Sequence, residues 1–392
     1  MGSFQLQKYT MSHRAKILCW VSVAIGVITF LAGLKFQSDR IWFSYLIGYF
    51  FTVSLALGGL FFTSFNHVTK AGWSVPVRRI AEAFSGFLPI AVFLTIPLLF
   101  GAKKLYLWLD LQAVASDPLL EMKASYLNQG FFHIRLLLFF GLWLFFAWKL
   151  VSNSLKQDET GDKNLTVQNV KYSIAFLIVF ALSYSLFSID VLMSLEPHWF
   201  STMFGVYTFA GLFHSFLAML ALFTIGLINN GTYKGIVNEN HVHDIAKFMW
   251  AFTIFFAYIG FSQYMLIWYA NLPEETIFFL HRAHGGWFQV SVALFFVKFL
   301  IPFLALAPRA AKRSLCHVRN VALLILASQF LDYFWLIFPN YNHEKVVLPT
   351  WEVGVLIGFL GAFVLQAKMF LSKNNTVPVK DPRLDEALHH HV

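Results

Sequence analysis

Ten long apolar runs dominate this sequence, each near or above the ~20 residues that a helix needs to cross the hydrocarbon of a bilayer. They lie at 15–34, 41–65, 80–100, 130–150, 171–192, 201–228, 245–270, 284–306, 319–338 and 351–371. A lipid-exposed backbone must satisfy its own hydrogen bonds, and runs this long without alternation fit helices rather than barrel strands. The sequence therefore predicts an all-α polytopic membrane protein, one integral membrane domain over residues 1–392, with a tail at 372–392.

Composition supports the membrane assignment. Of the 392 residues, 58% are hydrophobic and only 12% are charged, which is too little polar surface for a water-soluble globule of this size. The first apolar run has full spanning length and no small-residue cleavage site behind it, so it reads as a retained helix rather than a signal peptide.

Lys and Arg concentrate on alternate flanks of the runs. The flanks on the N-terminal side of the membrane hold Lys8, Arg14, Lys16, Lys70, Arg78, Arg79, Lys149, Lys156, Lys163, Lys171, Lys234, Lys247, Arg309, Lys312, Arg313, Arg319, Lys368, Lys373, Lys380 and Arg383. The other flanks hold far fewer, among them Lys103, Lys104 and Arg282. By the positive-inside rule both termini are cytoplasmic, and the net charge of +9 follows from topology rather than from nucleic-acid binding.

The connections are short, and none forms a separate domain. Residues 156–168 read as a polar inside loop, and 101–129 as an outside segment along the membrane surface. In that segment, Tyr106 and Trp108 are expected at headgroup level, and Asp117 before a proline signals a helix start. The two cysteines lie far apart and no haem-attachment motif occurs, so no metal site or covalently bound cofactor is predicted.

An internal repeat relates the two halves. The fifth run ends in FALSYSLFSIDVLMSLEP and the ninth in LLILASQFLDYFWLIFP, which place Asp190 and Asp332 at the same spacing before a proline. The fourth run opens GFFHIRLLLFF and the eighth GWFQVSVALFF. Chance matching is the alternative; duplication would use four helices twice and make a parallel repeat about an axis along the membrane normal.

Ionisable residues within the runs are the candidate functional groups. The candidates for a proton path are Glu82, Arg135, Asp190, His214, Lys298 and Asp332. Charges at such depth cost at least ~2.5–3.5 kcal/mol each, so they should face the bundle interior with partners, and Asp190 is the expected partner of Arg135. Depth order predicts a relay from Glu82 and Lys298 on the inner side through His214 to Asp190 and Asp332.

These residues also have structural explanations. The Arg135 and Asp190 pair could simply pin two helices, His214 could be a hydrogen-bonding packing residue, and Glu82 could cap the third helix. Lys298 lies about 11 residues from Arg309, too far for its stem to reach bulk water easily, which favours a functional role. On the outer hairpins, Glu196, Glu274 and Glu275 are candidates for docking partner proteins; His133, Asp190 and His198 are candidate quinone contacts.

Three motifs carry a family resemblance: SLEPHWFSTMFGVYTFAG at 194–211, FSQYMLIWYANLPEET at 261–276 and AGWSVPVRRIAEA at 71–83. With them, nearly the whole chain resembles ActF, the second quinone-binding-type membrane subunit of bacterial alternative complex III, which is similar to the NrfD and polysulfide-reductase membrane anchors. The resemblance implies ten helices arranged as two four-helix bundles plus flanking helices, in a bacterial inner membrane.

The resemblance also implies a role in a quinol:electron acceptor oxidoreductase, which passes electrons to cytochrome c or an oxidase. This subunit would contribute a proton path and a candidate quinone pocket, without being catalytic alone. Haem c and iron–sulfur clusters would lie in partner chains: a homologous NrfD-like membrane subunit, a periplasmic iron–sulfur protein, c-type cytochromes and a terminal oxidase. A secondary transporter, or the membrane anchor of a molybdenum-type reductase, are the alternatives.

Overall fold

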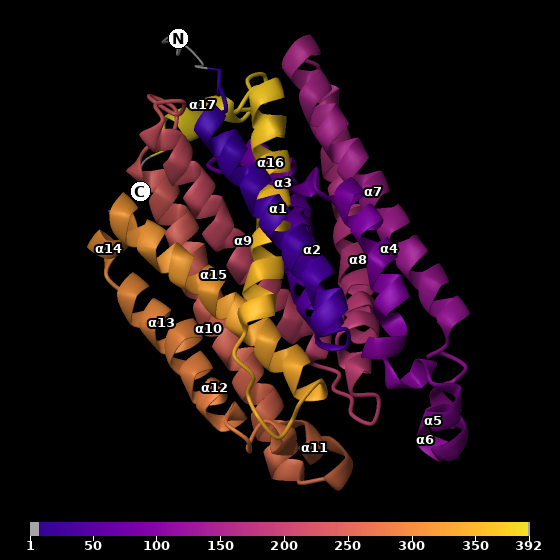
Figure 1. Ribbon diagram of the computed structural model, residues 1–392. Helices are drawn as coiled ribbons and strands as arrows, with labels where there is room; N and C mark the ends of the chain where they lie inside the picture. Colours follow the sequence, from indigo (N-terminus) through magenta and orange to yellow (C-terminus); the bar gives the residue numbers. More distant parts are fainter. Residues whose placement is uncertain (1–7, 391–392) are drawn as a thin grey trace.

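The computed structural model describes residues 8–390 as helices joined by short turns, with no strand in that part of the chain (Figure 1). The first half contains α1 His13–Phe36, α2 Arg40–Val68, α3 Val75–Ser85, α4 Leu88–Leu105, α5 Leu111–Ser116, α6 Pro118–Lys123, α7 Gln129–Thr160 and α8 Lys163–Val191. The second half contains α9 Phe204–Asn229, α10 Glu239–Ala270, α11 Pro273–His281, α12 Trp287–Leu294, α13 Ile301–Leu306, α14 Arg309–Arg313, α15 Leu315–Ile337, α16 Thr350–Lys373 and α17 Leu384–Leu388. Short 3-10 turns cover Leu107–Leu109, Met193–Leu195 and Phe338–Asn340, and a π-helical segment, Phe295–Leu300, joins α12 to α13.

Ten segments of the described chain are long and apolar enough to cross a membrane, which confirms the predicted spans. The start of α1 lies at the same end of the bundle as α17, and we call this end the termini end (Figure 1). The third span consists of two helices, α3 and α4, broken at Gly86, with a proline in the first turn of α4. The break leaves α3 buried at the termini end.

The helices pack as two four-helix bundles with two flanking helices, as predicted. Spans two to five, from α2 to α8, form the first bundle, and spans six to nine, from α9 to α15, form the second. α2 and α9 pack on each other where the bundles meet, so both are mostly buried. α16 packs on α2, and α1 lies along α16 on the outside (Figure 1).

A close glycine contact holds α1 to α16. A Cβ atom on Gly26 would lie 2.4 Å from the Cα of Gly358, closer than two carbon atoms can pack. Small residues let two membrane helices approach closely enough for their backbones to touch. The rest of α1 is largely exposed, as expected for a helix that faces lipid.

One prediction about a connection is wrong. Residues 156–168 are not a loop, because α7 continues to Thr160 and α8 starts at Lys163. Gly161 ends α7 in the left-handed conformation, with φ 71°, and the Asp162 side chain accepts a hydrogen bond from the Asn164 backbone N–H, so the reversal takes two residues. Sequence polarity there reflects helix ends that extend beyond the apolar region.

The outside segment 101–129 also differs in part from expectation. Asp117 does start a helix, since its side chain accepts hydrogen bonds from the backbone N–H groups of Leu119 and Leu120. Tyr106 and Trp108, however, are buried against the protein instead of being exposed on its surface. The Tyr106 hydroxyl donates to the carbonyl of Val191 at the end of α8, over 3.0 Å, and this bond compensates for its burial.

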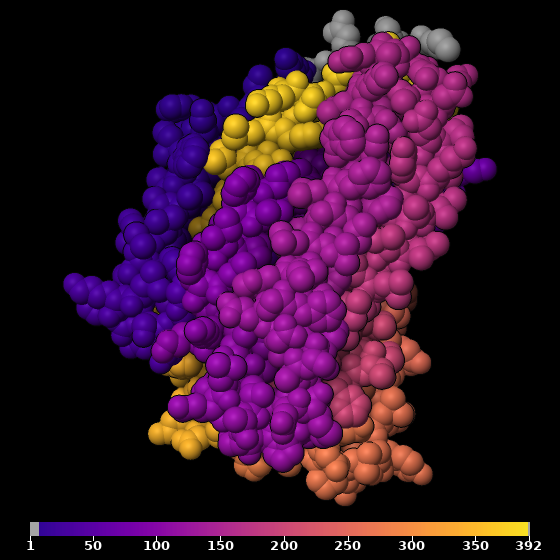
Figure 2. All heavy atoms as spheres, turned by 90° about the vertical axis from the view of Figure 1, so that its right-hand side faces the viewer, coloured from indigo at the N-terminus to yellow at the C-terminus, as the bar shows by residue number. Residues whose placement is uncertain are grey.

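The C-terminal tail folds back over the termini end of the bundle. Thr376, Val377, Asp381, Leu384 and Ala387 are buried there. Figure 2 shows C-terminal residues lying between α1 and α7 at this end. The tail is therefore part of the packed structure.

Candidate functional site

The first bundle contains a buried ion pair between α7 and α8. Arg135 Nε lies 2.7 Å from Asp190 Oδ2, and Nη2 lies 3.2 Å from Oδ1, so the predicted pairing is confirmed. The guanidinium also donates to the carbonyl of Tyr126 and lies over the rings of Tyr126 and Phe131. A bidentate arginine pair of this kind fixes orientation as well as charge.

The second bundle contains a buried cluster around Asp332 on α15. Lys298 Nζ lies 2.6 Å from Asp332 Oδ2 and 2.9 Å from Gln329 Oε1, and the Tyr207 hydroxyl donates to Asp332 Oδ1 over 2.5 Å. The ammonium also lies 3.7 Å from the centre of the Phe256 ring. Each oxygen of the carboxylate therefore has a partner, and all of these side chains are buried.

Asp190 and Asp332 occupy equivalent positions in the two halves of the repeat, but the cations that pair with them, Arg135 and Lys298, do not. In the alignment of the two repeat motifs, Ser291 rather than Lys298 stands in the place of Arg135, and Lys298 lies deeper in its helix. Lys298 sits within the π-helical segment, where the Ile301 N–H bonds to the carbonyl of Phe296. Side chains of a helix tilt toward its N-terminus, so the long lysine stem reaches back to Asp332. Lys298 and Asp332 are thus one pair rather than two separate stations of a relay.

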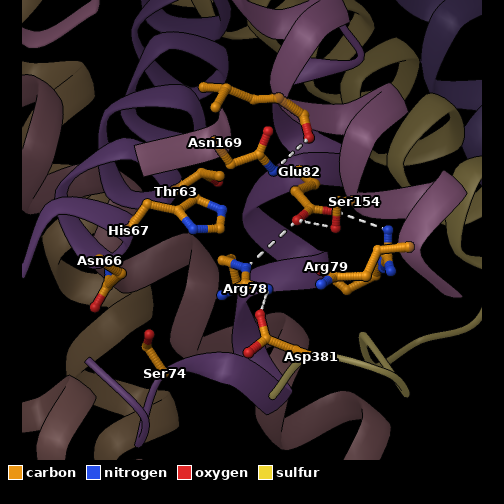
Figure 3. A network of polar contacts seen from close by, with 12 residues as sticks. Thr63, Asn66, His67, Ser74, Arg78, Arg79, Glu82, Ser154, Asn169 and Asp381 are labelled. Carbon is orange, nitrogen blue, oxygen red and sulfur yellow. Dashed lines mark hydrogen bonds and ion pairs between the residues drawn. The ribbon is translucent and has the colours of Figure 1, made fainter. Parts of the chain in front are cut away.

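A third polar cluster fills the termini end, between α3, α7 and the tail (Figure 3). Glu82 accepts from Arg79 over 2.8 Å and from Ser154 over 2.8 Å. Arg79 also pairs with Asp158 over 2.6 Å, and Arg78 pairs with Asp381 of the tail over 2.5 Å. Glu82 therefore does not cap α3; it joins α3 to α7. We call Arg78, Arg79, Glu82, Ser154, Asp158 and Asp381 the termini network.

The termini network has unused hydrogen-bonding capacity. Arg78 Nη1, Arg79 Nε and Asp158 Oδ1 are buried and have no hydrogen-bond partner in the described structure, and the same holds for Nε2 of His67, which lies beside the network in Figure 3. Buried polar atoms are nearly always satisfied, and ordered water is the usual partner when protein groups are not. The region is thus suited to hold water between ionisable groups.

His214 is the remaining candidate for the predicted proton path. It is fully buried on α9, with Nε2 3.0 Å from the Thr253 hydroxyl, while Nδ1 has no partner in the described residues. The bond to Thr253 fits a packing role, and the unpartnered nitrogen leaves capacity to exchange a proton through water.

At the end opposite the termini, Glu196 is held by basic side chains. Glu196 Oε1 lies 2.8 Å from His281 Nδ1, and Oε2 lies 3.5 Å from Arg282 Nη1. Burial lowers the pKa of Arg282 to about 10 and Glu196 opposes that shift, so the guanidinium keeps its charge near neutral pH. Glu274 and Glu275 lie in the first turn of α11, where Glu274 is exposed and Glu275 is half-buried. Of the three docking candidates, Glu196 is therefore already paired with side chains of this chain.

The three candidate quinone contacts do not share one set of partners. Asp190 is bound by Arg135, whereas His198 Nε2 lies 2.5 Å from Asp117 Oδ2 at the surface. The hydrogen bond from His198 lowers the pKa of Asp117 below its usual range. His133 is half-buried on α7, with its ring against Phe132.

A large cavity lies in the second bundle, beside α10, α11 and α12. Its volume is about 1070 Å³, and its walls are mostly apolar and aromatic. Tyr207 and Asp332 reach it from the buried cluster, and Gln263 and Arg282 reach it from α10 and the loop after α11. A largely apolar cavity with a few convergent polar groups is the usual form of a small-molecule site.

Several of these residues had little or no sequence signal. Gln263, Gln329 and Tyr207 are neutral residues within aromatic runs, and Arg282 appears in the sequence only as a flanking charge. The buried pair of Arg40 with Glu352, with Arg40 Nη2 2.9 Å from Glu352 Oε2, joins α2 to α16 and is another example. Within residues 8–390, no group of three or more His, Cys, Asp or Glu side chains is placed to hold a metal ion.

No protein-family model matches this chain, and no curated protein matches it. The fold and the buried charges define its class: an all-α, multi-pass membrane protein with two helix bundles, each of which encloses an ion pair.

Proposed function

We propose that this chain is an integral membrane subunit of a quinol:electron acceptor oxidoreductase and provides a path for protons through its two bundles. The observation that carries the proposal is the repeated buried carboxylate, Asp190 in one bundle and Asp332 in the other, each held by a cation away from lipid. Ionisable groups are retained inside membrane bundles chiefly where they move ions or protons, because burying them is costly.

The proposed path begins at the cytoplasmic face, which the positive-inside rule assigns to the termini end. Protons would enter at Glu82 in the termini network, whose unpartnered polar atoms favour water. They would pass His214 and reach the carboxylates near the opposite face. Water must bridge these groups, since the described hydrogen bond of His214 is to Thr253.

The proposed partners supply the redox chemistry. Haem c and iron–sulfur clusters would lie in periplasmic subunits docked on the face that carries Glu274 and Glu275, with a homologous membrane subunit alongside and a terminal oxidase as acceptor. A change of charge in a docked subunit would alter the proton affinity of the nearest carboxylate and so couple electron transfer to proton movement.

Purification of the tagged chain from its native membrane tests this function. The proposal predicts a complex coloured by c-type haem that oxidises quinol when an electron acceptor is added. A colourless protein that purifies alone, with no quinol oxidation, would contradict it. A complex that carries a molybdenum-type reductase instead would assign the chain as the membrane anchor of that enzyme.

A secondary transporter is the second candidate, and the interrupted eighth span favours it. Transporter sites often lie at helices that lose regular hydrogen bonding, and the π-helical segment Phe295–Leu300 places Lys298 beside Asp332 and the cavity. Substrate uptake by vesicles that contain only this chain, with no haem present, would support the transporter.

A further inference from the structure

Three basic side chains lie close together at the termini end of the seventh and eighth spans. Lys247 lies on α10, Arg309 begins α14, and Lys312 follows one turn later. All three act electrostatically on His243, and we call them the basic cluster. Burial lowers the pKa of Lys312, and the positive charge of Lys247 lowers it further. The two lysines therefore repel each other, and an anion bound beside them would relieve that repulsion.

The described structure offers the basic cluster little negative charge. Asp244 lies 2.5 Å from Lys247 Nζ, but it also lies 2.6 Å from His390 Nε2. Lys312 Nζ donates to two backbone carbonyls at the end of α13, over 2.7 and 2.8 Å, and pairs with no carboxylate among residues 8–390. The charge of Lys312 is therefore not neutralised by the described residues, and a phosphate group would complement it.

Trp250 places the basic cluster at the level of the lipid head groups. Its indole N–H donates to the carbonyl of Phe303 over 3.1 Å, and its ring stacks on that of Phe303. The Lys312 ammonium lies 5.4 Å from the centre of the same tryptophan ring. Tryptophan is enriched where hydrocarbon meets the polar head groups, and lysine and arginine lie just beyond it.

An exposed stripe of α10 leads from the basic cluster toward the opposite end of the helix. Exposed residues recur along it at intervals of three or four, namely Lys247, Ala251, Ile254, Tyr258 and Phe261. This spacing puts them on one face of a helix. The last three also line the large cavity of the second bundle. The basic cluster and the cavity are therefore connected along one lipid-facing surface.

The dimensions of this surface match one acyl chain. Lys247 and Tyr258 are eleven residues apart, or about 16 Å along the helix. An acyl chain covers half of the ~30 Å hydrocarbon core, so a lipid with its head group at Lys247 reaches the level of Tyr258. Phe295 of the eighth span lines the cavity there and is exposed like Tyr258, so the cavity opens to hydrocarbon. Figure 1 shows α14, α13 and α12 following one another along this edge of the bundle.

We propose that this surface binds an anionic phospholipid of the leaflet at the termini end, with its phosphate at the basic cluster and one acyl chain along the α10 stripe into the cavity. Basic pockets between membrane helices bind anionic head groups. The cavity, of about 1070 Å³, has room for the end of an acyl chain. A zwitterionic lipid carries its own cation to the basic cluster and gains less from it. The inference does not depend on the proposed oxidoreductase function.

Native mass spectrometry of the full chain, titrated with phosphatidylglycerol or with phosphatidylcholine of the same acyl chains, tests the charge requirement. One cation beside an anionic head group contributes about fivefold in affinity. We expect phosphatidylglycerol to bind at least about fivefold more tightly than phosphatidylcholine. Lys247→Gln should weaken phosphatidylglycerol binding by about fivefold and leave phosphatidylcholine unaffected.

Lys171→Gln is the matched control for this variant. Lys171 is exposed at the ninth position of α8, as Lys247 is at the ninth position of α10, and α8 also starts at the termini end. Phosphatidylglycerol binding should be unchanged by Lys171→Gln. Equal affinities for the two lipids, or equal effects of the two substitutions, would overturn the proposal.

A second variant tests the path of the acyl chain. Gly260 lines the cavity on α10, and a Cβ atom there would meet only the Tyr207 ring, at 3.4 Å, so a larger side chain has room to enter the cavity. Gly260→Phe should weaken phosphatidylglycerol binding at least about fivefold by filling that space. Gly141→Phe, with nothing within 4 Å of its Cβ position on α7, should bind normally.

A photoreactive group midway along the acyl chain gives a further check of location. It should label α10 near Ile254 and Tyr258, because these residues form the stripe that the chain follows. Labelling spread over all lipid-facing helices, or unaltered binding by Gly260→Phe, would show that lipid merely coats the surface and would refute the proposal.

These measurements need no haem partner and no electron acceptor. A chain that purifies without haem but prefers the anionic lipid would uphold the lipid site while the oxidoreductase proposal fails. A haem-containing, quinol-oxidising complex with no preference between the two lipids would give the reverse result.

Discussion

Removal of the charge on Lys298 should destabilise the protein strongly, and removal of both charges should not. Lys298 and Asp332 are 2.6 Å apart with side chains 1% and 2% exposed, so Lys298→Met leaves a carboxylate buried without its cation. Breaking one partner of a buried pair costs about 3–5 kcal/mol, whereas replacing both with neutral groups is often nearly neutral. We expect a loss of about 3–5 kcal/mol for Lys298→Met and less than about 1 kcal/mol for Lys298→Met with Asp332→Asn.

Unfolding of the purified protein by SDS in mixed micelles measures these free energies. Lys171→Met is the matched control, because Lys171 lies exposed on α8, and its effect should stay within about 0.5 kcal/mol. A single variant as stable as the wild type would refute the reasoning, since it would mean that water or lipid headgroups reach Asp332. A double variant that loses as much as the single one would mean that the pair contributes through packing rather than charge.

Two further predictions concern the packing of the tail and of α1. Burial raises the pKa of Asp381, but the effect of Arg78 is larger, and the pKa falls to about 2. Docking of the tail should therefore be complete above the ordinary aspartate pKa and weaken as the pH falls toward 2, which faster proteolysis of the tail would show. Asp381→Asn should show that fast cleavage already at neutral pH. Gly26→Leu forces a side chain against Gly358 and should lower the free energy of unfolding in the SDS assay by about 1–3 kcal/mol. Gly141→Leu is the control and should lower it little, because nothing lies within 4 Å of the Cβ position of Gly141. Equal effects of the two substitutions would contradict the close packing of α1 on α16.

The fold follows from sequence because one physical requirement governs it. A helix must be about 20 apolar residues long to span hydrocarbon, and the described chain contains ten segments of at least that length. The pairing of Arg135 with Asp190 was also predictable, because buried charges need partners and both residues belong to consecutive spans at similar depth.

The features that sequence reasoning missed depend on side-chain direction and on distant contacts. Lys298 was placed on the inner side by its position in the helix, but its stem turns toward the helix N-terminus and reaches Asp332. The tail has a polar sequence that gives no sign of packing, yet Asp381 pairs with Arg78, more than 300 residues away in the sequence. Gln263 carries no charge and interrupts no pattern, so only the cavity around it distinguishes it.

The central claim is that the buried carboxylates move protons when quinol is oxidised. The ratio of protons released to electrons transferred, measured in vesicles that contain the whole complex, tests it most directly. Asp190→Asn and Asp332→Asn should each lower this ratio while electron transfer continues, and Glu352→Gln, which removes an equally buried carboxylate between α2 and α16, should leave it unchanged. A ratio identical in all three variants and the wild type would contradict the account and leave the ion pairs a purely structural role.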